Sequence, residues 1–350
     1  MRGTQHAVTV ITVAIAALAP AAAITAAAAS ASPARSRAQV ATAHIRVKAT
    51  IPVGRAPLGV ATDPRTDTVY VANTGGKSVS VISGRTNTVV ATIPVGRVPA
   101  GVAANPRTDT IYVANERSGT VSVISGRTNT VVARVRVGRF PYGVAANPRT
   151  NTIYVTNVFS GTVSVISGRT NTVVATVRVG RFPVAVATNP RTNTTYVARD
   201  SKRVPVISGR TNTVVARVRV GFFPEAVAAD PRTSTVYVTN SRGKKVSVIS
   251  GRTNTVLATV HGGFQAAFGI ATNPRTNTIY VADGGDETWV ISGRTNTVVA
   301  KVRVGSEPVG VAANLRTNTV YVTNIGDNTV SVLVSCRGRP AASESARGCR

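Results

Sequence analysis

The chain has 350 residues and a formal net charge of +28 at pH 7, with 43% hydrophobic residues but only 5% aromatic ones. Its apolar residues are mainly Val, Ala and Ile, and no long helical periodicity appears after residue 50. β-branched side chains favour strands, so helix-bundle and α/β classes are excluded. A charge this large calls for an acidic partner or for a role in solubility.

The N-terminus predicts a signal peptide over residues 1–31. Arg2 precedes an apolar run from Ala7 to about Ala29, followed by small residues suited to cleavage. Pro20 and the Ala-rich composition argue against a permanent membrane anchor. We expect a secreted protein, with cell-wall association as a further expectation, and a flexible linker over residues 32–43.

A repeated phrase, Tyr-Val-(Ala/Thr)-Asn or a close variant, recurs at intervals of 41 to 43 residues. Its tyrosines are Tyr70, Tyr112, Tyr154, Tyr196, Tyr237, Tyr280 and Tyr321. Residues 143–180 show one unit: four short apolar stretches separated by an Asn-Pro-Arg-Thr turn, a loop and a Ser-Gly-Arg-Thr-Asn turn. Asx-Pro starts a turn with a fixed φ, and Ser-Gly allows a positive φ. Four strands in about 42 residues is the signature of a propeller blade.

The two ends of the repeat array predict that the ring closes. The seventh unit stops after its third strand, at Val334, and the missing fourth-strand sequence stands at the front of the array, over residues 45–53. The fold class is therefore all-β: one seven-bladed β-propeller of four-stranded antiparallel blades over residues 44–334, the last blade completed by the N-terminal strand. A solenoid is the competing architecture, but it does not require a repeat unit that is divided between the two ends of the array, so the divided unit favours the ring. Residues 335–350 form a C-terminal tail.

These repeats resemble the YVTN-repeat β-propeller family, close to exported bacterial YncE-like proteins and similar to surface-layer propellers. The resemblance covers nearly the whole predicted mature chain, and it implies the fold. One propeller scaffold hosts many functions, so the resemblance says little about activity.

Two faces follow from the blade geometry. The turn face carries the first-to-second and third-to-fourth strand turns; the loop face carries the second-to-third strand loops and the inter-blade loops. One arginine of the turn face follows each Asx-Pro, or Leu315 in the last unit: Arg65, Arg107, Arg149, Arg191, Arg232, Arg275 and Arg316. These predict a polyanion-binding surface for a cell-wall polymer or nucleic acid. The alternative is that duplication copied a solubilising turn. Sequence-specific DNA binding is not expected, because the sequence contains no recognised DNA-binding motif.

The loop face is where the copies differ. Its predicted ligand or partner site consists of Phe140, Tyr142, Phe182, Phe223, Phe264, Phe268 and Glu225. An aromatic surface beside charged groups suits a ligand or a protein partner. The alternative is that these phenylalanines fill gaps between blades.

The inventory of reactive residues argues against an enzyme. No His, Cys and carboxylate cluster has metal-ligand spacing, and no catalytic residue is assigned. Propeller lyases and lactonases, which resemble this fold, use metal-bound carboxylates or His near the channel, so a metal-assisted enzyme is the alternative. No cofactor is expected; the weak candidates for a divalent cation such as Ca²⁺ are Asp283, Asp286 and Glu287.

Cys336 and Cys349 are the only cysteines. Export makes a disulfide between them the expectation. We expect a monomer without a membrane span after signal cleavage. The function expected from the sequence is a secreted, non-enzymatic binding or cell-surface propeller whose ligand lies on the loop face.

Overall fold

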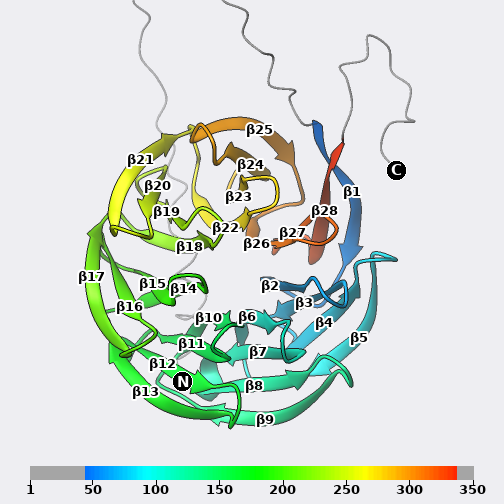
Figure 1. Cartoon of the computed structure of the whole chain (residues 1–350). Helices are drawn as coiled ribbons and strands as arrows, with labels where there is room; N and C mark the ends of the chain where they lie inside the picture. The colour runs from blue at the N-terminus through cyan, green and yellow to red at the C-terminus, as the bar shows by residue number, and fades with distance from the viewer. Residues whose placement is uncertain (1–43, 337–350) are drawn as a thin grey trace, which may run out of the picture. The chain divides into compact units, whose positions relative to one another are not determined.

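The computed structural model describes residues 44–336. The predicted signal peptide and linker lie outside these residues, and so does Cys349, the second half of the predicted disulfide. Seven four-stranded antiparallel sheets are arranged in a ring (Figure 1), which confirms the seven-bladed propeller.

The first strand of each blade lines the central channel. These inner strands are β2 (Pro57–Asp63), β6 (Pro99–Asn105), β10 (Pro141–Asn147), β14 (Pro183–Asn189), β18 (Pro224–Asp230), β22 (Ala267–Asn273) and β26 (Pro308–Asn314). The second strands are β3 (Thr68–Asn73), β7 (Thr110–Asn115), β11 (Thr152–Asn157), β15 (Thr194–Arg199), β19 (Thr235–Asn240), β23 (Thr278–Asp283) and β27 (Thr319–Asn324).

The third strands are β4 (Ser78–Ser83), β8 (Thr120–Ser125), β12 (Thr162–Ser167), β16 (Arg203–Ser208), β20 (Lys245–Ser250), β24 (Glu287–Ser292) and β28 (Thr329–Cys336). The outer strands are β5 (Thr88–Pro94), β9 (Thr130–Arg136), β13 (Thr172–Arg178), β17 (Thr213–Arg219), β21 (Thr255–His261), β25 (Thr297–Arg303) and β1 (His44–Pro52). One short 3₁₀ turn, η1 (Glu116–Ser118), follows β7. In the part of the chain from 44 to 336 no helix has the length and apolarity needed to cross a bilayer.

The ring is closed by the N-terminal strand, as predicted. β1 pairs antiparallel with β28 from His44↔Cys336 to Pro52↔Thr329, and the two lie side by side in Figure 1. Blade 7 thus joins segments from opposite ends of the chain.

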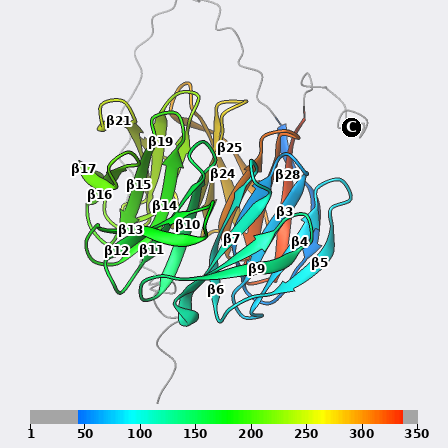
Figure 2. The same cartoon turned by 60° about the horizontal axis from the view of Figure 1, so that its bottom comes forward.

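The core consists of seven apolar clusters, one at each junction between neighbouring blades. The tyrosine of each repeat lies in these clusters and is at most 3% exposed. The asparagine that ends the phrase is buried as well: Asn73 Nδ2 donates to Ser80 Oγ at 2.9 Å. A Cβ at Gly54 would lie 2.5 Å from the Asn73 side chain, which explains the glycine of the inter-blade loop. The connections of the blades gather at two opposite faces (Figure 2).

Candidate functional site

The loop-face end of the channel is built from the residue that follows the first residue of each inner strand. These seven equivalent positions hold Leu58, Ala100, Tyr142, Val184, Glu225, Phe268 and Val309. Tyr142 and Glu225 are half-buried. Burial raises the pKa of Tyr142, and the carboxylates of Glu225 and Glu116 raise it further. The predicted Tyr142 and Glu225 thus occupy equivalent positions at this end of the channel, in blades 3 and 5.

Glu225 is the acid at this channel end. Burial raises its pKa above the ordinary glutamate value, a hydrogen bond with Ser241 opposes this, and Asp200 adds to it. A carboxyl with a raised pKa holds its proton to higher pH, so the group can both accept and donate a proton nearer neutrality.

Three phenylalanines meet on the loop face above blades 3 and 4, and we call them the aromatic cluster: Phe140, Phe159 and Phe182. The ring centroids of Phe140 and Phe159 are 4.2 Å apart, and those of Phe159 and Phe182 are 6.2 Å apart, both edge to face. Phe159 is 50% exposed. The structure thus brings the predicted Phe140 and Phe182 together through Phe159, from the loop between β11 and β12.

Two further phenylalanines continue the aromatic surface towards blade 5. Phe222 is 55% exposed and carries the Lys202 ammonium 3.8 Å from its ring centroid. Phe223 carries the Arg242 guanidinium carbon 3.9 Å from its centroid. Cations over aromatic faces are attracted by the ring quadrupole, so this surface combines apolar area with positive charge.

The loops of one face and the turns of the other share a left-handed backbone conformation but fill it with different residue types. Phe140, Phe182 and Phe223 all have φ between 51° and 54°, a region that costs an L-residue other than Gly, Asn or Asp roughly 1–2 kcal/mol. Each carbonyl there accepts a bond from the neighbouring loop, as Val158 N donates to Phe140 O at 2.9 Å. The turn face meets the same demand mostly with Asn or Asp, for example Asn151 and Asn193. Ala56, Val98 and Glu307 adopt the same φ at the equivalent loop-face positions, so the backbone conformation itself does not call for an aromatic side chain.

The remaining predicted aromatic residues lie apart from the cluster. Phe264 is 1% exposed and packs against Trp289 with ring centroids 4.6 Å apart. Phe268 is half-buried in β22, and its carbonyl accepts a hydrogen bond from Thr239 Oγ1 at 2.9 Å. Phe264 belongs to the core between blades 5 and 6.

The three acids considered for a cation each have a protein partner. Asp283 is 1% exposed and accepts bonds from the backbone N of Gln265 and Ala266, at 3.0 and 2.8 Å. Asp286 accepts one from Glu307 N at 3.1 Å, and Glu287 lies 3.9 Å from Lys301 Nζ. Within residues 44–336 no three His, Cys, Asp or Glu side chains are grouped to hold a metal.

The arginines that follow Asx-Pro form a ring on the turn face, which we call the arginine collar. Six of the seven donate to a backbone carbonyl in the turn of the next blade, at 3.0 to 3.3 Å. Arg107 reaches Arg149 O, Arg149 reaches Arg191 O, and Arg316 closes the circle on Arg65 O. All seven collar side chains remain exposed. Sequence reasoning placed these arginines on one face but missed the carbonyl contacts that link the blades.

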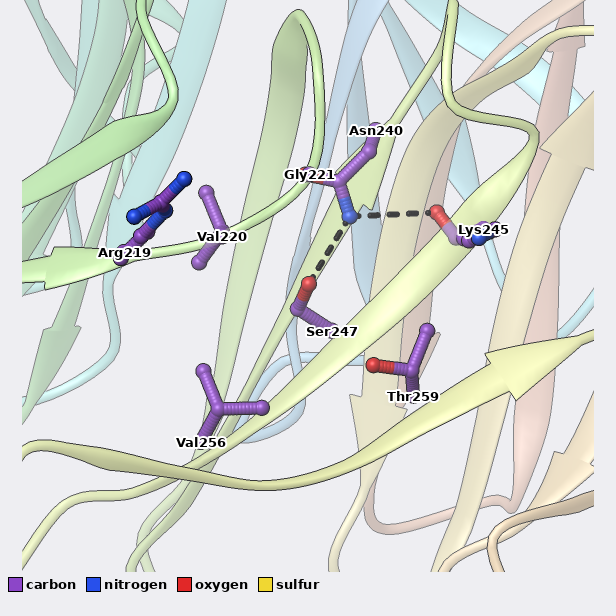
Figure 3. Close-up of a pocket in the computed structure, with 8 residues that line it drawn as sticks. All are labelled: Arg219, Val220, Gly221, Asn240, Lys245, Ser247, Val256 and Thr259. Carbon is purple, nitrogen blue, oxygen red and sulfur yellow. Dashed lines mark hydrogen bonds between the residues drawn. The ribbon is translucent and has the colours of Figure 1, made fainter.

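One pocket of about 270 Å³ lies between β17 and the outer half of blade 5 (Figure 3). Its lining includes Arg219, Lys245 and Thr259, and Asn240 Nδ2 bonds Ser247 Oγ at 3.0 Å in its wall. The Asn–Ser bond recurs in other blades, as in Asn157–Ser164 at 2.9 Å. The pocket contains none of the predicted site residues, and its hydrogen bonds belong to the repeated scaffold.

Comparisons with known proteins bear on the fold. No family model matches the chain, and no curated protein matches it. Among solved structures, a chain of hydrazine synthase from Kuenenia stuttgartiensis superimposes with a TM-score of 0.72 at 20% identity, over 79% of this chain and 95% of that chain. At this identity the similarity supports a common propeller fold and carries no activity across.

Proposed function

We propose that this chain is a secreted or cell-surface binding propeller of the YVTN-repeat type, whose ligand or partner binds the loop face over blades 3 to 5. The regular spacing of the seven tyrosine phrases supports the family, and the apolar N-terminal run supports export. The observation that carries the function is the aromatic cluster together with Phe222 and Phe223.

Two features of these residues favour binding over packing. Phe159 and Phe222 leave 50% and 55% of their surface in solvent, and exposed apolar patches on a protein surface mark interaction sites. Phe182 stands at φ 51°, where the equivalent position in blade 1 holds Ala56 at φ 52°. Blade 1 thus forms the same loop without an aromatic ring, so the ring of Phe182 is dispensable for the loop.

The binding of 8-anilinonaphthalene-1-sulfonate tests the proposal, because this dye presents an aromatic ring system and an anionic group to an aromatic and cationic surface. The folded wild-type chain should enhance the dye fluorescence with saturation. Phe182→Ala, which installs the residue that blade 1 has as Ala56, and Phe159→Ser should each weaken dye binding by about 1–2 kcal/mol, the size expected for anchor residues. Peptides and oligosaccharides that displace the dye from wild type identify the natural ligand class.

Thermal unfolding of the same variants is the control. Removing a packed core phenylalanine costs roughly 3–5 kcal/mol, whereas an exposed anchor costs much less. The proposed site would be contradicted if both variants lost as much stability as the removal of a core phenylalanine costs. It would also be contradicted if the variants bound the dye as tightly as wild type does.

A second candidate function rests on Glu225, which lies at the same end of the channel as Tyr142. Burial raises the pKa of the Glu225 carboxyl, and a carboxyl with a raised pKa is suited to general acid–base catalysis. If this end of the channel is a catalytic site, Glu225→Gln abolishes the activity, while Phe182→Ala changes mainly the substrate affinity. A chelator-sensitive activity would favour the metal-assisted lyase or lactonase chemistry.

A further inference from the structure

The arginine collar has a geometry that an ordinary basic surface lacks. Each anchored guanidinium bonds a carbonyl of the next blade through its Nη1 or, in Arg65, its Nε. Arginine has five N–H donors in a planar fork, so most donors of each anchored group stay available. The anchor fixes a long side chain that would otherwise lose rotamer entropy on binding.

Three consecutive blades of the collar carry anchored arginines without an ion pair among residues 44–336. Arg65 is paired with Asp109, Nη2 to Oδ2 at 3.0 Å. Arg107, Arg149 and Arg191 follow one another over blades 2 to 4 and have no ion pair among the described residues. The turns of blades 3 and 4 carry Asn151 and Asn193 where blade 2 carries Asp109.

A second set of arginines on the same face offers a matched comparison. Arg127, Arg169 and Arg210 stand in the third-to-fourth strand turns of the same three blades and are exposed. Between residues 44 and 336, their guanidiniums show no hydrogen bond or ion pair. The two sets share charge, face and blades and differ in anchoring.

We propose that the arc formed by Arg107, Arg149 and Arg191 binds a linear phosphate polymer, with successive phosphates contacting successive blades. Guanidinium forks match phosphate oxygens in a bidentate geometry that an ammonium group cannot reproduce. A polymer fits because the donors are distributed along the ring and not gathered at one point. This inference concerns the turn face and is independent of the loop-face function.

Inorganic polyphosphate is the probe, and the full-length chain is titrated with it by calorimetry over a salt series. The affinity should fall steeply with salt, as expected when bound phosphates release counterions. The triple variant R107K/R149K/R191K keeps the charge but loses the forks, and it should bind about tenfold more weakly or worse. The matched variant R127K/R169K/R210K should lose less than about threefold.

Equal losses in the two triple variants would overturn the proposal in favour of diffuse charge, and so would the absence of polyphosphate binding or an equal affinity for orthophosphate. Circular dichroism establishes that each variant is folded. If the collar triple variant fails to fold, the single variants R149K and R169K make the same comparison. Dye binding at the loop face should be unchanged in every lysine variant, which separates this result from the fate of the loop-face site.

Discussion

Single polar residues on the turn face decide how neighbouring blades are linked below the arginine collar. Asn147 Nδ2 donates to Asn193 Oδ1 at 2.9 Å, and Asn105 Nδ2 donates to Asn151 Oδ1 at 2.8 Å. Asp230 occupies the same position in blade 5, where a carboxylate has no amide hydrogen to donate. Asn277 Oδ1 in blade 6 is accordingly buried without a hydrogen-bond partner among residues 44–336.

Asp230→Asn should therefore stabilise the protein. The new amide would donate to Asn277 Oδ1, while the remaining Oδ1 would keep the bond from Arg232 N, now 2.8 Å. One hydrogen bond gained in a buried site contributes about 1 kcal/mol. Urea unfolding measures the change, and Asn147→Asp, which removes the equivalent bond, should destabilise by a similar amount. An unchanged midpoint for both variants would contradict this account of the blade junctions.

Glu225 makes a pH-dependent contribution to stability. Because its pKa is raised in the folded state, its charged form is disfavoured by folding, and stability from this residue is lost as pH rises through the folded pKa. Glu225→Gln should stabilise the protein at pH 8, and the gain should disappear below the ordinary pKa of glutamate, about 4.3. Thermal unfolding from pH 4 to 8 checks this. A gain that is the same at every pH would mean that the carboxyl is not desolvated.

The residue types of the site were predictable from the sequence, but their contacts were not. Phe140 and Phe182 stand out because equivalent positions hold Ala56 and Val98. Burial of Phe264 was not foreseeable, because it depends on Trp289, which replaces the serine that five other blades have at this position of the third strand. The carbonyl anchors of the collar link turns that are 41 or 42 residues apart, or 251 apart where Arg316 meets Arg65, and no local pattern reports them.

At the scale of elements, the fold was predictable because each strand boundary carries its own turn chemistry. The β-bulges of the outer strands, in contrast, could not be predicted from the sequence. In β13 the pairing passes from Ala175↔Val165 to Val173↔Ile166, so Val174 is left out of the register and is 58% exposed. A bulge twists an edge strand and so protects it from pairing with another chain. The consecutive valines are equally compatible with a continuous strand, which is why the sequence pattern hides the bulge.

The latch strand β1 should be decisive for stability. Ile51 is 3% exposed and lies in the cluster that joins blade 7 to blade 1. Ile51→Ala should destabilise by about 2–5 kcal/mol, and deletion of residues 44–53 should lower the unfolding midpoint further because blade 7 loses its fourth strand. Val90→Ala, at an exposed bulge position of β5, is the matched control and should have a small effect. A midpoint unaffected by the deletion would refute the latch.

At the scale of the whole molecule, one ring presents two chemically different faces. The loop face is the place where the repeats diverge, and it carries exposed aromatic rings beside cations. The turn face is the place where the repeats agree, and it carries the anchored collar. The seven junction clusters hold both faces on one rigid support, so substitutions on one face should leave binding at the other unaffected.

One crossed measurement tests this division most directly. The affinities for 8-anilinonaphthalene-1-sulfonate and for polyphosphate are measured for three proteins: wild type, the loop-face variant Phe159→Ser/Phe182→Ala, and the collar variant R107K/R149K/R191K. We predict that the loop-face variant loses dye binding and keeps polyphosphate binding, and that the collar variant does the reverse. If either variant weakens both ligands equally, or if the loop-face variant binds the dye as wild type does, the assignment of binding to the loop face is contradicted.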